Sequence, residues 1–216
     1  MAMNDEENRI LDRIIETRRT VRAFKGDTIS KEMLEGIIHA GLWAPFAGLA
    51  ISDEREFRKF FVIQLGSPLL GRINDLIKQQ SKLSLEEIQR TFTEQPFLRE
   101  KATGYLARIT SMAEKGFPEL SNIPCLIIVA EQRGMPPAEK QSLAHVVENM
   151  WLKATALGLG LRLISVIDTL TANKDFSELL GLNHGEYAYT ACIVGFAAQA
   201  QQAGKRPADH DVTKWL

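Results

Sequence analysis

The feature that most constrains the fold is a nearly continuous apolar run from Cys125 to Ala130. A strand with one face in water alternates polar and apolar residues, whereas an unbroken apolar run is typical of a strand buried on both faces. The longest helical pattern follows, from about Ala138 to Leu157, with apolar residues recurring at spacings of three and four. Gly158 stands where such a helix is expected to end. The sequence therefore predicts a central strand with a long helix packed in the core.

Shorter elements surround this centre. The patterns predict further strands at 60–63, 159–167 and 189–196, and helices ending near Thr17, starting at Ser30, spanning most of 69–119 and covering 171–180. Strands separated by helices of uneven length favour an α+β fold with three layers. At 216 residues the chain suits a single domain, 1–216, with 69–119 as a helical cover or lid and 197–216 as an extended polar tail.

Composition excludes several classes of function. With 26 basic and 27 acidic residues the formal charge is −1, so no global field attracts nucleic acid or an anionic membrane. No stretch approaches the ~20 apolar residues of a membrane span, and we expect a soluble cytoplasmic protein. Cys125 and Cys192 lie in apolar runs, which predicts buried thiols and no disulfide. The four histidines are not spaced as metal ligands, and we expect no metal site.

The densest local charge is the stretch from Arg18 to Phe24, which places Arg18, Arg19, Thr20 and Arg22 within five positions. A guanidinium group can donate two parallel hydrogen bonds to the oxygens of a phosphate, and a threonine hydroxyl adds a neutral donor. The alternative is a solvated cationic helix end that complements the helix dipole. The chain has neither a P-loop nor a dinucleotide fingerprint, and no elbow for a catalytic serine. A local phosphate site without a nucleophile suggests that a bound cofactor supplies the chemistry.

The order of several motifs resembles the nitroreductase family of FMN flavoproteins. The arginine stretch, the helix ending Trp43-Ala44-Pro45 with Ala47-Gly48 after it, and the segment from Glu148 to Gly160 fall where that family has them. Leu180-Gly181-Leu182 and the strand ending at Gly195 agree as well. Together these motifs bracket nearly the whole chain, with 69–119 as the unmatched part.

The resemblance implies a three-layer α+β fold with a mostly antiparallel sheet of four to five strands, and a homodimer with FMN at the interface. It also implies that the tail reaches the partner subunit and that NAD(P)H reduces an electron-poor acceptor, such as a nitroaromatic or a quinone, through the flavin. Arg18, Arg19, Thr20 and Arg22 would hold the phosphate and ribityl chain, with Lys205 and Arg206 from the tail. The resemblance places the remaining cofactor positions at Pro45, Phe46, Ala47, Ser165 and Val166. For Lys205 and Arg206, solvated charge is the alternative.

The segment after Pro45 departs from the family. The family continues with serine, asparagine and a Gln-Pro-Trp motif, whereas this chain has Phe46-Ala47-Gly48-Leu49 and no such motif. Phe46 is expected either to stack on a ring or to fill the core. Two alternatives to the oxidoreductase follow, an FMN-binding protein without turnover and a specialised relative acting on flavin or on halogenated aromatics.

Overall fold

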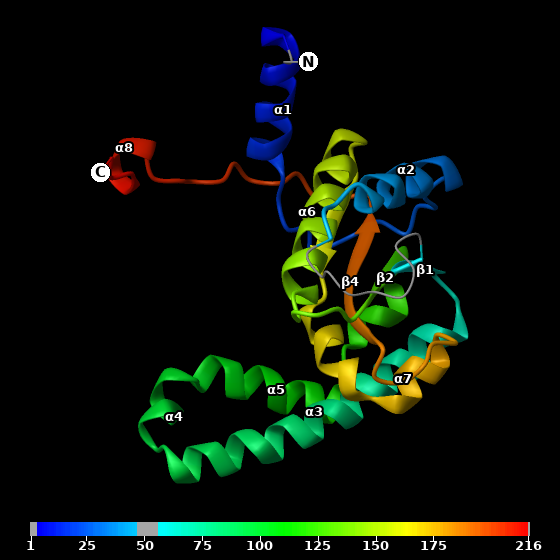
Figure 1. Ribbon diagram of the computed structural model, residues 1–216, viewed down its shortest axis with the longest axis vertical. Coiled ribbons are helices and arrows are strands. Elements are labelled where there is room, and N and C mark those ends of the chain that lie inside the picture. The colour runs from blue at the N-terminus through cyan, green and yellow to red at the C-terminus, as the bar shows by residue number, and fades with distance from the viewer. Residues whose placement is uncertain (1–3, 47–55, 216) are drawn as a thin grey trace.

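The computed structural model describes residues 4–46 and 56–215 and is built on a four-stranded antiparallel sheet (Figure 1). The strand order is β1-β2-β4-β3. The strands are β1 (Arg58–Gln64), β2 (Cys125–Gln132), β3 (Gly160–Leu163) and β4 (Tyr187–Gly195). The two central strands, β2 and β4, are buried along almost their whole length, which confirms the expectation for the apolar run. The sheet is antiparallel throughout, with Ile127 opposite Cys192 at its centre.

One face of the sheet is covered by α2 (Lys31–Leu42) and α6 (Glu139–Ala156). The Ser30 hydroxyl caps α2 by accepting a hydrogen bond from the Met33 amide at 3.3 Å, as its position predicts. The helix α6 ends where Gly158 adopts a φ of +74°, which a residue with a Cβ rarely adopts. Val146, Met150 and Ala154 of α6 are fully buried against the sheet.

The other face is covered by the beginning of α3 (Pro68–Glu94), by α5 (Thr103–Lys115) and by three short helices. These are the 3₁₀ helices η1 (Pro118–Asn122) and η2 (Ser165–Ala172) and the α-helix α7 (Lys174–Leu179). The expected strand 159–167 is therefore too long, because β3 ends at Leu163 and the chain turns into η2. Asn173 caps α7 through the Phe176 amide. Helices on both faces give the predicted three layers.

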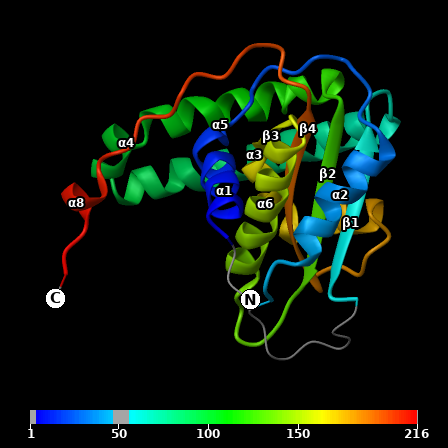
Figure 2. The same cartoon turned by 90° about the horizontal axis from the view of Figure 1, so that it is seen from above.

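Beyond the sheet, α3 and α5 run side by side as a hairpin that projects from the body, with α4 (Phe97–Lys101) at its tip (Figures 1 and 2). The buried residues of α3 all lie in its first half, from Leu70 to Ser81. Two sequence expectations fail here. The sequence Ser84-Leu85-Glu86-Glu87 fits a capping box, but Ser84 does not begin a helix, because α3 continues through it. Gly104, which the sequence predicts as a break in the helical pattern, lies inside α5. Only the part of this region nearest the sheet covers it.

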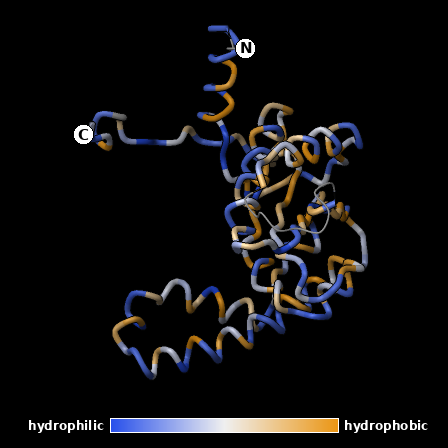
Figure 3. The backbone as a smooth tube through the Cα atoms, viewed as in Figure 1, coloured by the Kyte–Doolittle hydropathy of each residue, from blue (hydrophilic) through white to orange (hydrophobic). Residues whose placement is uncertain are grey.

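Both chain ends leave the body. The helix α1 (Asp5–Thr17) has no buried residue, and its apolar side chains Ile10, Leu11 and Ile15 are exposed. The tail after Phe196 is polar and extended, with one short helix, α8 (Asp209–Val212), near its end (Figures 1 and 3). Among the described residues, no helix is long and apolar enough to cross a membrane.

Candidate functional site

The arginine stretch is fixed along the outer edge of β3. Thr20 forms a parallel bridge with Leu161, and the Val21 amide donates to the Leu161 carbonyl at 3.2 Å. Gly160 permits this approach, because a Cβ there would clash with the Val21 side chain. The next residues meet the start of the tail, where Lys25 donates its amide to the Phe196 carbonyl at 2.9 Å. The two ends of the chain therefore meet beside β3.

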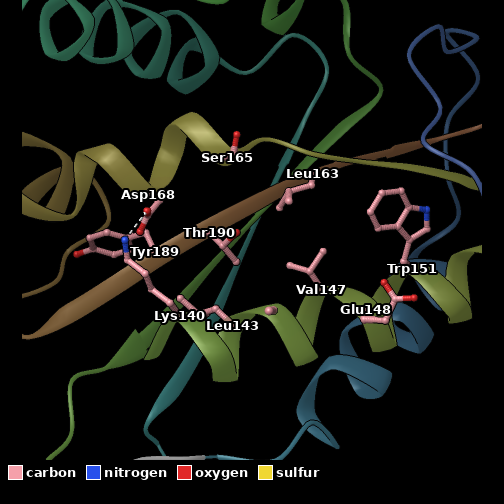
Figure 4. A pocket seen from close by; sticks show the side chains of 11 residues that line it. Lys140, Leu143, Val147, Glu148, Trp151, Leu163, Ser165, Asp168, Tyr189 and Thr190 are labelled. Carbon is pink, nitrogen blue, oxygen red and sulfur yellow. Dashed lines mark ion pairs between the residues drawn. The ribbon is translucent and has the colours of Figure 1, made fainter. Parts of the chain in front are cut away.

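Arg18 is held by two residues of α6 that the sequence analysis did not identify. Its Nε lies 3.0 Å from an oxygen of Glu148, and its guanidinium carbon lies 4.6 Å from the centre of the Trp151 ring. The Trp151 indole N–H donates to the Arg19 carbonyl at 3.1 Å. Figure 4 shows Glu148 and Trp151 near one another on the part of α6 away from Lys140. These contacts hold the start of the arginine stretch against α6.

The tail groove is a cavity of about 670 Å³ between the end of α1 and the tail. Its lining includes Arg18, Arg19 and Arg206. The Arg19 Nε donates to the Gln202 carbonyl at 3.1 Å, and a Cβ at Gly204 would lie 2.6 Å from the Arg19 guanidinium. The structure thus brings Arg206, from the far end of the chain, beside the N-terminal arginines. Lys205 is exposed and does not line this groove.

The α6 pocket lies between α6 and the junction of β3 with η2 and has a volume of about 370 Å³ (Figure 4). Val147, Trp151 and Leu163 give it apolar walls. Its far end is spanned by the ion pair of Lys140 with Asp168, at 3.1 Å. Burial raises the pKa of the Tyr189 hydroxyl, which donates to Ser177 at 3.1 Å. A flat apolar ring matches the surface of Val147, Trp151 and Leu163, with polar side chains around it.

The cationic pocket lies on the other side of the same junction and has a volume of about 400 Å³. Thr20 and Arg22 line it from the arginine stretch, and Ser165 lines it from η2. Arg108 of α5 and Arg162 of β3 complete its positive charge. The Ser165 side chain points away from α6 in Figure 4, whereas Val166 is buried. Leu163 and Ser165 are shared with the α6 pocket, so the two cavities are neighbours.

Pro45 and Phe46 lie away from the three cavities. They line neither the tail groove nor the cationic pocket nor the α6 pocket. Phe46 packs on Phe57 with 4.5 Å between ring centres, and Ala47 lies outside the described residues. Within one chain, this part of the predicted site is therefore not brought together with the arginines.

A buried ion pair holds the chain where it leaves α2 and approaches Pro45. Arg58 donates from Nε to Glu131 at 2.7 Å, and its Nη1 donates to the carbonyls of Gly41 and Ala44 at 3.0 and 3.1 Å. Its Nη2 reaches the Pro45 carbonyl at 3.4 Å, which also accepts from the Ser142 hydroxyl at 3.1 Å. Burial raises the pKa of the Glu131 carboxyl, and the Arg58 charge opposes this.

Metal and thiol chemistry find no support in the part of the chain that the structure describes. No group of three or more histidine, cysteine or acidic side chains within 4–46 and 56–215 is arranged to hold a metal ion. Cys125 and Cys192 are free and buried, as predicted. Burial raises the pKa of the Cys125 thiol to about 12 and that of Cys192 in the same direction. Both thiols are therefore protonated and unreactive at neutral pH.

Four residues at these cavities escaped the sequence analysis. Glu148 and Trp151 belong to the long helix, where their spacing of three places them on one face, but nothing in the sequence shows which partner that face meets. Arg162 had a usable signal, because it interrupts the apolar run Gly160-Leu161-Arg162-Leu163-Ile164. Arg108 has none, since a charged residue on a helix is ordinarily solvated.

With this geometry in view, comparison with known proteins settles the family. A model of the nitroreductase family matches residues 15–196. The chain belongs to the nitroreductase family. A search of curated proteins found no significant match.

Solved structures of this family share the fold. A nitroreductase with bound FMN from Bacteroides fragilis is 19% identical, with a TM-score of 0.68 over 99% of this chain and 100% of that chain. A BluB-like flavoprotein from Clostridium difficile is 20% identical, with a TM-score of 0.67 over 100% of both chains. A structure from Parabacteroides distasonis, described as an NADH dehydrogenase/NAD(P)H nitroreductase, is 16% identical, with a TM-score of 0.55 over 94% and 96%. At these identities, the likeness concerns the fold.

Proposed function

We propose that this nitroreductase-family protein is an FMN-dependent oxidoreductase that transfers reducing equivalents from NAD(P)H to an electron-poor acceptor such as a nitroaromatic or a quinone. The observation that carries the proposal is the tail groove, where Arg18, Arg19 and Arg206 converge from opposite ends of the chain. FMN in the related Bacteroides fragilis structure and the description of the Parabacteroides distasonis relative support the choice of cofactor and reductant.

The residues present fit FMN. The guanidinium groups in the tail groove suit a phosphate. Gly204 lies close to the Arg19 guanidinium, so this group lies beside the main chain of the tail. Arg18, Arg19 and Arg206 would hold the phosphate, with Lys205 nearby, and Thr20 and Arg22 would follow along the ribityl chain. Val147, Trp151 and Leu163 would pack on the ring, and the main chain at Ser165 and Val166 would approach its polar edge.

When bound, FMN supplies the hydride chemistry, and the protein supplies binding, orientation and electrostatics. Val147, Trp151 and Leu163 would shield the face of a ring that packs on them from water. Backbone N–H groups at the start of η2 would stabilise negative charge on that ring. The Trp151 ring keeps the Arg18 guanidinium in place, so the phosphate site is partly organised before the cofactor arrives.

The same arrangement supports a homodimer as part of the proposal. Pro45 and Phe46 line none of the three cavities of their own chain, and the tail extends away from the body (Figures 1 and 2). The exposed apolar residues of α1, Ile10, Leu11 and Ile15, form a stripe that a second copy would bury. In the proposed dimer, Pro45, Phe46 and Ala47 would reach the ring held by the partner.

The test begins with an absorbance spectrum of the purified protein, which we expect to show bound flavin after addition of FMN. NADH and NADPH oxidation is then measured with nitroaromatic and quinone acceptors, and the molar mass is measured by light scattering. A colourless protein that does not take up FMN refutes the proposal. Tight FMN binding without turnover on any acceptor would instead establish a flavin-binding protein. The segment after Pro45 favours that outcome, because Phe46 stands where the family has a serine.

A further inference from the structure

The cationic pocket contains more positive charge than the proposed cofactor uses. Arg22, Arg108 and Arg162 line it, against Glu119 as the one acidic lining residue. Within the described residues, none of the three arginines has a carboxylate within ion-pair distance. Burial lowers the pKa of Arg162, Glu119 opposes this, and the charges of Arg22 and Arg108 lower it further. Three like charges around one cavity repel one another, so a bound anion would stabilise the arrangement.

The arginines come from three separate elements. Arg22 follows the bridge to β3, Arg162 lies on β3 itself, and Arg108 lies on α5 of the projecting hairpin. The Arg162 guanidinium carbon lies 4.9 Å from the centre of the Phe117 ring, which fixes the group above an aromatic face. Met112 and Leu163 add apolar surface to the same cavity. The lining therefore suits a ligand that is both anionic and apolar.

The phosphate of FMN does not account for this charge. The tail groove and the cationic pocket have no lining residue in common, although Arg19 and Thr20 are adjacent in the chain. The cationic pocket instead shares Leu163 and Ser165 with the α6 pocket, where the ring is proposed to lie. A ligand in the cationic pocket would thus lie beside the ring site.

We propose that Arg108 and Arg162 form an anion subsite for the electron acceptor, and that this protein prefers aromatic acceptors that carry a carboxylate. This inference rests on the proposed function, because it assigns the acceptor of that same reaction. The carboxylate would lie between the guanidinium groups, and the aromatic part would contact Phe117, Met112 and Leu163. Arg22 is left out of the test because it is already assigned to the cofactor.

The first test measures binding without turnover. Titration calorimetry compares 4-nitrobenzoate with its neutral analogue 4-nitrobenzamide on the purified protein, with and without added FMN. We expect the carboxylate to bind at least tenfold more tightly than the amide, and R108Q or R162Q to reduce carboxylate affinity about tenfold or more while leaving the amide unchanged. R90Q is the matched control, because Arg90 is an exposed arginine of α3 that lines none of the three cavities described here.

The second test measures acceptor preference in the holoenzyme. Each nitro group reduced to nitroso takes two electrons and two protons, releases one water and oxidises one NAD(P)H. We expect kcat/KM for 4-nitrobenzoate to fall about tenfold or more in R108Q, with the value for the amide unchanged. Arg108 is exposed, so R108Q remains informative even if R162Q does not fold.

Three outcomes separate this inference from the proposed function. Equal affinities for carboxylate and amide in a protein that binds FMN and turns over refute the anion subsite alone. Arginine-dependent binding of 4-nitrobenzoate by a protein that never binds FMN upholds the anion subsite and refutes the oxidoreductase. A loss of FMN affinity and a lower flavin midpoint potential in R108Q and R162Q, with no change in acceptor discrimination, assigns the arginines to the flavin ring and overturns the inference.

Discussion

Removing Arg58 is expected to destabilise the protein by about 3 to 5 kcal/mol, the usual cost of leaving one member of a buried ion pair without its partner. The side chains of Arg58 and Glu131 are 1% and 0% exposed, with 2.6 Å between Nη2 of Arg58 and an oxygen of Glu131. R58M would also remove the donor to the carbonyls of Gly41, Ala44 and Pro45. For a chain of this length, such a loss corresponds to a fall in Tm of roughly 6 to 20 °C.

The loss of stability in R58M should depend on pH in a defined direction. Burial raises the pKa of Glu131 above its ordinary value of 4.5, and removing Arg58 raises it further. In the folded variant the Glu131 carboxyl keeps its proton at pH values above 4.5, where the same carboxyl in the unfolded chain has released it. Its stability is fully present below about pH 4.5 and is lost as pH rises toward the raised folded value. The deficit of R58M should therefore be smaller at pH 5 than at pH 8.

Urea denaturation of four variants, R58M, E131L, R58M/E131L and K59M, at both pH values tests this reasoning. R58M/E131L removes both charges and should recover most of the loss, because no unpaired charge then remains buried. K59M is the control, since Lys59 pairs with Glu56 at 3.4 Å near the surface, and its loss should cost under about 1 kcal/mol. A cost of R58M no larger than that of K59M, or a double variant as unstable as the sum of R58M and E131L, would refute a stabilising buried ion pair.

Further predictions concern the site and the thiols. R18A should weaken FMN binding by about 1.5 to 3 kcal/mol, measured by fluorescence titration, since it removes a charge-assisted contact. E148Q should strengthen FMN binding or leave it unchanged in the same titration, because it removes an anion that competes for Arg18. Truncation after Gln201 removes Arg206 and should weaken FMN binding without changing Tm by more than a few degrees, as the tail is exposed. Cys125 should resist a thiol reagent at pH 8 in the native protein, because burial raises its pKa to about 12. The same shift predicts that the free energy of unfolding falls as pH rises from about 9 toward 12, by up to roughly 1.4 kcal/mol per pH unit relative to C125A.

The sequence predicted those parts of the fold that depend on local patterns. The apolar run at 125–130, the cap at Ser30 and the glycine at position 158 each specify a local conformation, and each prediction was confirmed. The expected strand 159–167 was too long, because a 3₁₀ helix rich in apolar residues has the same composition as a buried strand. The Ser84 pattern failed because a capping sequence has no effect within a helix that already continues through it.

The site was less predictable, because its parts meet through tertiary contacts. Arg206 and Arg19 line the same groove because the tail begins beside residues 23–25, whereas the sequence offers only two basic residues in a polar segment. Arg108 and Arg162 converge from a hairpin and a strand more than fifty residues apart. The family resemblance identified positions that contact a cofactor in relatives, but it contained no information on charges that are particular to this chain.

The contact of Arg18 with Glu148 shows why the tail groove can hold an arginine in place and still bind a phosphate. The two side chains are 24% and 47% exposed, so their ion pair contributes at most about 1 kcal/mol. A phosphate that receives two hydrogen bonds from the same guanidinium contributes more, about 1.5 to 3 kcal/mol for each charge-assisted bond. We therefore expect a phosphate to displace Glu148 from Arg18, while the Trp151 ring beneath Arg18 would keep the guanidinium in position. A lysine at position 18 would lose both the paired hydrogen bonds and the stacking, which is why the residue type matters here as well as its charge.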